Sequence, residues 1–355
     1  MATTRGDLRD LIRHPIIAAP MAGGVSGPAL AAAVSRAGGL GFLAGGYKDA
    51  ARLREEITRL RATTEAFGVN LFVPGACAAD PAALEAYRER LRPEASRLGV
   101  EPGEPRAGDD DWDAKIEDLL ADPVPVVSFT FGCPSREVIE AFRARGTLVM
   151  VTVTTPQEAR RVPAADALCV QGGEAGGHRG SFAGAEDPPA YGVRELVTAV
   201  REVTDVPLVA AGGLATGEDV AEVLARGAIA AQVGTAFLRT PESGAPPAHK
   251  AALVDARFAA TAVTRAFTGR PARGLVNRFM SEHGPHAPAA YPHVHHITAP
   301  LRRAAAQRGE ADAMALWAGT GHRLAAELPA EQVLERLLPP GRRPPRRRSL
   351  DSGPQ

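Results

Sequence analysis

Eight short apolar runs divide the first two-thirds of the chain. They cover residues 15–21, 39–46, 67–73, 124–132, 146–155, 167–174, 206–213 and 228–238. Within each run the apolar residues are continuous rather than alternating with polar ones, which is typical of strands buried on both faces of a parallel sheet. The pattern therefore predicts eight parallel strands.

The segments between these runs carry helix signals. Ser26 is placed to cap a helix that has Pro28 in its first turn, and Thr216 to cap another that has Asp219 near its start. Strand–helix alternation repeated eight times favours one α/β fold, a parallel (β/α)₈ TIM barrel over residues 1–240. An open doubly wound sheet fits less well, because such sheets usually have fewer strands and no GxGxxG follows the first run.

The rest of the chain has a different character. Residues 80–122 form an insertion with two helical pieces around a polar loop, and residues 241–338 predict a smaller, largely helical cap beside the barrel mouth. His249 and Lys250 are expected at a solvated helix start. The final residues, 339–355, are rich in Pro and Arg with little to bury, so we expect a disordered tail.

Composition narrows the class of protein. The 41 basic and 41 acidic residues balance, so no overall field attracts nucleic acid or an anionic membrane. Cys77, Cys133 and Cys169 are too widely spaced for a disulfide framework or a metal knuckle, which indicates a reducing compartment. The N-terminus lacks the apolar segment of a signal peptide, and no apolar run is long enough to cross a bilayer. We expect a cytoplasmic protein without nucleic-acid or membrane partners.

Glycines follow the seventh and eighth runs. In such a barrel the loops after these two strands commonly bind phosphate, because glycine lets backbone N–H groups approach the phosphate oxygens. Gly212 and Gly213 end one run, and Gly234 and Thr235 the other. We expect a phosphate site there.

The densest chemical signal is the segment 171–180, QGGEAGGHRG, directly after the sixth run. Its glycines shape a backbone that can approach a ligand, and it brings His178 to the barrel mouth, where imidazole suits proton transfer or anion binding. Gln171, Glu174 and Arg179 accompany it. Met21 and Asn70, at the ends of the first and third runs, are further candidates.

One cluster of histidines raises the hypothesis of a metal site. His293, His295 and His296 lie close together in YPHVHH, but no neighbouring carboxylate or cysteine completes a ligand set. We predict no metal, and the sequence assigns the cluster no role.

Several of these segments occur in one order typical of a known family. APMAGGVSGPAL, FGVNLFVP, VSFTFGCP, QGGEAGGHRGSF, AAGGLATGEDV and QVGTAFLRTPES resemble the FMN-dependent nitronate monooxygenases of the bacterial class. The late segment YPHVHHITAPLRR is similar as well. The resemblance covers about Pro15 to Leu338, and the AGGHRG loop is more specific to the superfamily than to one reaction.

The resemblance implies a role for each candidate. His178 would be the catalytic residue, facing the substrate. Some relatives carry a second histidine near the position that is Thr130 here, so the resemblance does not imply a two-histidine site in this chain. The implied FMN-binding residues are Met21 beside the ring, Asn70, Gln171 and Gly176 at the isoalloxazine and ribityl parts, and Gly212, Gly213, Gln232, Val233, Gly234 and Thr235 at the phosphate.

The implied reaction is oxidation of alkyl nitronates with dioxygen to a carbonyl compound and nitrite. The implied partners are thus a small nitronate and O₂, and a homodimer is compatible with the sequence, which does not set the oligomeric state. An alternative on the same fold is an NAD(P)H-dependent FMN reductase of enoyl thioesters or quinones. A second alternative is a flavin-binding protein without turnover.

Overall fold

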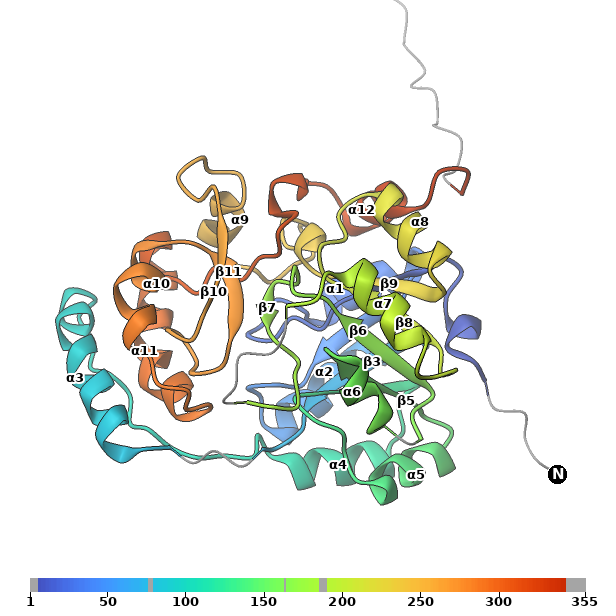
Figure 1. Ribbon diagram of the computed structural model, residues 1–355, viewed down its shortest axis with the longest axis horizontal. Coiled ribbons are helices and arrows are strands. Elements are labelled where there is room, and N and C mark those ends of the chain that lie inside the picture. The colour runs from blue at the N-terminus through green and yellow to red at the C-terminus, as the bar shows by residue number, and fades with distance from the viewer. Residues whose placement is uncertain (1–5, 76–78, 163, 185–189, 343–355) are drawn as a thin grey trace, which may run out of the picture.

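The computed structural model describes residues 6–75, 79–162, 164–184 and 190–342. Eight parallel strands pair in the order β1-β9-β8-β6-β5-β4-β3-β2, and a bridge between Ile17 and Leu40 joins the two ends into a nearly closed barrel (Figure 1). The eight predicted strands are confirmed. They are β1 (Ile16–Ala18), β2 (Gly41–Ala44), β3 (Phe67–Phe72), β4 (Val126–Thr130), β5 (Leu148–Val153), β6 (Ala167–Gln171), β8 (Leu208–Ala211) and β9 (Ala228–Val233).

Helices surround this barrel, which confirms the (β/α)₈ architecture. They are α1 (Pro28–Arg36), α2 (Ala50–Arg61), α4 (Trp112–Ala121), α5 (Arg136–Ala144), α6 (Pro156–Arg160), α7 (Val193–Arg201), α8 (Gly217–Ala225) and α12 (Ala330–Leu337). Helix α12 comes from the end of the described chain yet contacts α1 and α8. It therefore fills the place between the last helix and the first.

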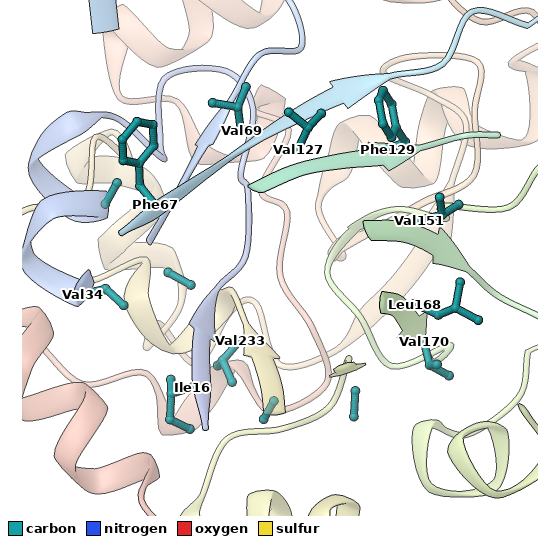
Figure 2. Packing of buried hydrophobic residues seen from close by; sticks show 14 of the residues in the cluster. Ile16, Val34, Phe67, Val69, Val127, Phe129, Val151, Leu168, Val170 and Val233 are labelled. Carbon is teal, nitrogen blue, oxygen red and sulfur yellow. The ribbon is translucent and has the colours of Figure 1, made fainter. Parts of the chain in front are cut away.

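Strand residues alternate between two cores. In β6, Leu168 and Val170 pack outward against the helices, whereas Cys169 between them belongs to the cluster that fills the barrel interior. Figure 2 shows the outward set, including Val69, Val127 and Val170. Both faces of the strands are buried, as the continuous apolar runs predict.

The two predicted helix caps differ in outcome. Thr216 caps α8, and its hydroxyl and the Asp219 carboxylate form a reciprocal capping box. Ser26 does not cap α1, because Gly27 occupies the cap position. The Ser26 hydroxyl instead accepts the Met21 N–H at 2.9 Å and donates to the Ala19 carbonyl at 3.1 Å. It holds the turn that follows β1, at the barrel mouth.

A second unit lies beside the mouth (Figure 1). It contains α9 (Pro247–Ala252), α10 (Arg278–His283), α11 (His293–Arg308) and the antiparallel sheet β10-β11-β7, formed by β10 (Thr261–Thr264), β11 (Ala272–Leu275) and β7 (Gly177–His178). The helical region is thus present, but the pattern did not predict the small sheet, whose strands have at most four residues.

The insertion contributes to this unit as well. Its first helix, α3 (Pro81–Arg97), shares a hydrophobic cluster with α11, and the Tyr87 hydroxyl donates to the Ala266 carbonyl at 2.6 Å. Division of the chain at residues 240 and 338 stays a prediction. Of the predicted disordered tail, 339–355, residues 343–355 lie outside the described residues. In the described part, no helix is long and apolar enough to cross a membrane.

Candidate active site

A cavity of about 620 Å³ opens where the carboxyl ends of the barrel strands meet the second unit. Cavities of this size accommodate cofactors and small ligands. All the site residues expected from the sequence line it: Met21, Asn70, Gln171, Gly176, His178, Gly212, Gly213, Gln232, Val233, Gly234 and Thr235. Their individual roles stay proposals.

The two glycine turns lie at one level of the barrel mouth. The register of β8 and β9 pairs Ala211 with Gln232. Gly213 and Gly234, each two residues further along the chain, therefore lie next to each other just beyond the strand ends. Gly212 and Gly213 have φ angles of 106° and 69°, which side chains rarely tolerate. The N–H groups of Gly213 and Gly234 form no backbone hydrogen bond with the described residues. They are available to an anion.

Two amide side chains have fixed orientations near these turns. Asn70 donates to the hydroxyls of Ser128 at 2.9 Å and Thr130 at 3.0 Å. Gln232 donates to the Cys169 sulfur at 3.3 Å, and its buried Oε1 has no partner among the described residues. A buried acceptor without a partner is costly, so a ligand that donates a hydrogen bond to Oε1 would stabilise the site.

Gln171 holds the loop that carries His178. Its amide donates to the His178 carbonyl at 3.1 Å and its oxygen accepts the Gly180 N–H at 2.8 Å. Glu174 likewise serves the fold, since its carboxylate accepts the Val193 N–H at the start of α7 at 3.1 Å. The side-chain nitrogen and oxygen of Gln171 therefore both form hydrogen bonds within the loop, and the Glu174 carboxylate anchors the start of α7.

His178 is half-buried among aromatic rings and stays neutral. Burial, with Arg270 and Arg302 nearby, lowers its pKa to about 3. Its Nε2 lies 2.9 Å from the Thr268 hydroxyl, which is the one hydrogen bond of the imidazole among the described residues. The rings of Tyr47, Phe131, Tyr291 and Trp317 lie 5.6 to 6.5 Å from the imidazole.

A second histidine reaches the cavity from α11. His295 stacks on Tyr47 at 4.0 Å, and Arg302 donates to its Nδ1 at 3.0 Å. Burial and Arg302 lower the pKa of His295, so the cation in this group is Arg302. Burial raises the pKa of Tyr47 to about 12, which keeps its hydroxyl a donor.

The charge of the lining favours an anion. Arg302 and Arg303 line the cavity, and no Asp or Glu does so within the described residues. Arg270 lies just outside, with its guanidinium 3.9 Å from the centre of the Phe131 ring. With both neighbouring histidines neutral, the arginines dominate the local field.

His249 and the histidines of the YPHVHH segment lie in different surroundings from those expected. The prediction of a solvated His249 was wrong: it is buried, lines the cavity, and its Nε2 lies 3.1 Å from the Trp317 carbonyl. In the YPHVHH cluster, His296 accepts a hydrogen bond from Arg106 at 3.1 Å, whereas His295 lines the cavity. Among the described residues no group of three or more His, Cys, Asp or Glu is arranged to hold a metal ion.

Sequence reasoning missed several lining residues. Tyr47 follows a predicted strand directly, so its position was a usable signal. Tyr47 and Phe131 have positive φ angles of 65° and 79°, a strained backbone that often marks a functional site. Arg302 and Trp317 come from the second unit, where no local pattern distinguishes them from ordinary helix or core residues.

Comparisons of the sequence with known proteins all identify nitronate monooxygenases. A family model described as nitronate monooxygenase matches residues 6–340. A nitronate monooxygenase from Pseudomonas aeruginosa is 43% identical over 339 residues, which is 92% of this chain and 96% of the relative. The resemblance noted in the sequence motifs is confirmed.

Solved structures agree. A nitroalkane oxidase from Streptomyces ansochromogenes is 57% identical, with a TM-score of 0.90, over 93% of this chain and 96% of that one. FabK from Thermotoga maritima is 30% identical, with a TM-score of 0.70, over 94% and 95% of the two chains. The similarity is thus greater to the nitroalkane oxidase than to FabK.

Proposed function

The chain belongs to the nitronate monooxygenase family, and on this premise we propose that its cavity binds FMN and oxidises alkyl nitronates with dioxygen. Enzymes of this family are generally flavin-dependent. Two nitronates and one dioxygen give two carbonyl compounds and two nitrite ions, so atoms and charge balance without another reductant. The physiological nitronate is left open by this proposal.

The residues of the cavity fit FMN. The free N–H groups of Gly213 and Gly234 suit the phosphate, and the unpartnered Oε1 of Gln232 suits a hydroxyl or N–H donor of the cofactor. Asn70 and Gly176 would lie along the ribityl chain and ring, with Met21 beside the ring. When bound, FMN supplies the electron transfer between nitronate and dioxygen.

The observation that carries the substrate assignment is a half-buried cation, Arg302, near a neutral histidine in a cavity that no described carboxylate lines. Arg302 favours the nitronate anion by its charge. His178 orients the nitronate through Nδ1, and the Tyr47 hydroxyl is a second donor. The aromatic walls exclude water, which strengthens these interactions.

The cofactor is tested by its spectrum. We expect the purified protein to be yellow, and heat denaturation to release FMN and not FAD. A colourless protein that cannot be reconstituted with FMN would contradict the assignment.

The reductase alternative is tested by anaerobic NADH and NADPH. We expect neither to bleach the flavin rapidly, whereas a nitronate turns over and releases nitrite without them. Rapid bleaching together with reduction of an enoyl thioester or a quinone would favour the alternative.

A further inference from the structure

A second cavity, of about 670 Å³, lies between the β10–β11 hairpin and the loop that follows β6. None of its lining residues lines the first cavity. Its lining includes apolar residues such as Val263 and Met280 together with Arg179, Arg265 and Arg273, and Val263 and Arg273 are paired across the hairpin. No Asp or Glu lines it within the described residues.

Arg179, at the wall of this cavity, has a guanidinium nitrogen without a hydrogen-bond acceptor among the described residues. Its side chain is 3% exposed, Nη1 donates to the Gly172 carbonyl at 2.5 Å, and the buried Nη2 has no partner among the described residues. A buried guanidinium nitrogen without an acceptor is costly. An anion in the cavity would supply that acceptor.

Arg273 reinforces the positive field. Its Nε donates to the Gly173 carbonyl at 2.9 Å, which fixes its guanidinium at the cavity wall. Burial and the nearby Arg273 lower the pKa of Arg179, while the carboxylates of Glu158 and Glu174 oppose this shift without cancelling it. Arginine pairs of this kind bind phosphate and carboxylate through directed hydrogen bonds.

The second cavity lies behind the strand that carries His178. β7 pairs with β11, with His178 opposite Ala272 and Gly177 opposite Arg273. Arg179 is the first residue after this strand. His178 lines the first cavity, and Arg179 lines the second.

We propose that this second cavity binds a small anionic molecule, with a phosphate or carboxylate held by Arg179 and Arg273 and an apolar body against the β10–β11 hairpin. The inference is independent of the proposed function, because it involves none of the residues assigned to FMN or nitronate. Binding, rather than turnover, is the appropriate readout.

The test is calorimetric titration of the full-length protein with phenyl phosphate and, separately, benzoate, with and without saturating FMN. Phenol is the probe without an anionic group. We expect at least one anionic probe to bind in the millimolar range or tighter, with or without FMN, and phenol to bind much more weakly.

Two variants locate the binding. Val263 is 45% exposed and lines the cavity, so Val263→Glu adds a negative charge there without disturbing the core. We expect it to weaken binding of the anionic probe roughly tenfold. Val254 is 47% exposed and lines neither cavity, so Val254→Glu is the matched control and should bind like the wild type.

Equal affinity of wild type and Val263→Glu would overturn the proposal, as would no binding of either anion.

Discussion

The Nε2 atom of His178 lies 2.9 Å from the Oγ1 atom of Thr268, whose hydroxyl is also 3.3 Å from the Arg270 carbonyl. The single hydroxyl proton can serve one of these two acceptors at a time. When it serves His178, the imidazole carries its own proton on Nδ1 and can donate to a nitronate oxygen. When it serves Arg270, Nδ1 is an acceptor. Thr268 therefore sets which hydrogen-bonding role His178 offers.

This relationship predicts the effect of Thr268→Val, which keeps the shape but removes the hydroxyl. Nitronate turnover should fall roughly tenfold, because the tautomer is no longer selected. FMN binding should be unchanged. Thr268→Ser restores the hydroxyl and is the control, so wild-type turnover in the valine variant would disprove the role.

Replacing His178 with Asn separates orientation from proton removal. With a preformed nitronate no proton leaves, so turnover should fall by roughly ten- to a hundredfold while FMN is retained. If the neutral nitroalkane is also a substrate, its turnover should fall by roughly 10²–10⁴. The measurement is nitrite release from matched nitroalkane and nitronate. No effect on either would remove His178 from the active site.

The two phosphate turns respond differently to substitution. Gly234 has an ordinary φ of −109°, and an added Cβ would meet Ala19 and Met21 at 3.4 Å. Gly234→Val should lower FMN affinity at least tenfold with little loss of melting temperature, because its methyl groups occupy the phosphate space.

Gly213 has a φ of 69°, and its Cβ would lie 2.8 Å from the Glu174 Cβ. Gly213→Ala should therefore lose both FMN and thermal stability. FMN titration and thermal denaturation of the two variants check this difference, and undiminished FMN affinity in Gly234→Val would contradict the phosphate assignment.

Histidines that stay neutral in the folded protein make its stability depend on pH. Burial lowers the pKa of His178 to about 3 and of His249 to about 4, below the unfolded value of about 6.5. The unfolded chain therefore binds more protons below about pH 6.5. Each histidine should then remove about 1.4 kcal/mol of unfolding free energy per pH unit down towards pH 4.

Urea unfolding at about pH 7 and about pH 5.5 measures this loss. His249→Gln should make the pH dependence shallower, whereas His286→Gln, at an exposed position, should not. Identical slopes for wild type and His249→Gln would rule out His249 as a source of the effect.

The sequence predicts those site residues that directly follow a strand with a clear apolar pattern, and not those that reach the site from the second unit. Gly213, Gly234 and His178 follow strands of strong apolar pattern, so the geometry of a parallel barrel predicts that they lie at its mouth. Arg302 and Thr268 reach the same cavity from the second unit, whose packing depends on contacts distant in sequence. Ser26 shows a related limit, because a serine before a helix can equally hold the preceding turn.

The central claim is most directly tested by nitrite and oxygen measured together. With FMN-loaded protein, a preformed alkyl nitronate and no NADH or NADPH, we predict enzyme-dependent release of about two nitrite ions per dioxygen consumed, as the balanced oxidation requires, at a rate that the reaction without protein does not approach. Absence of nitrite above that background across a panel of nitronates, in protein that retains its flavin, would contradict the account.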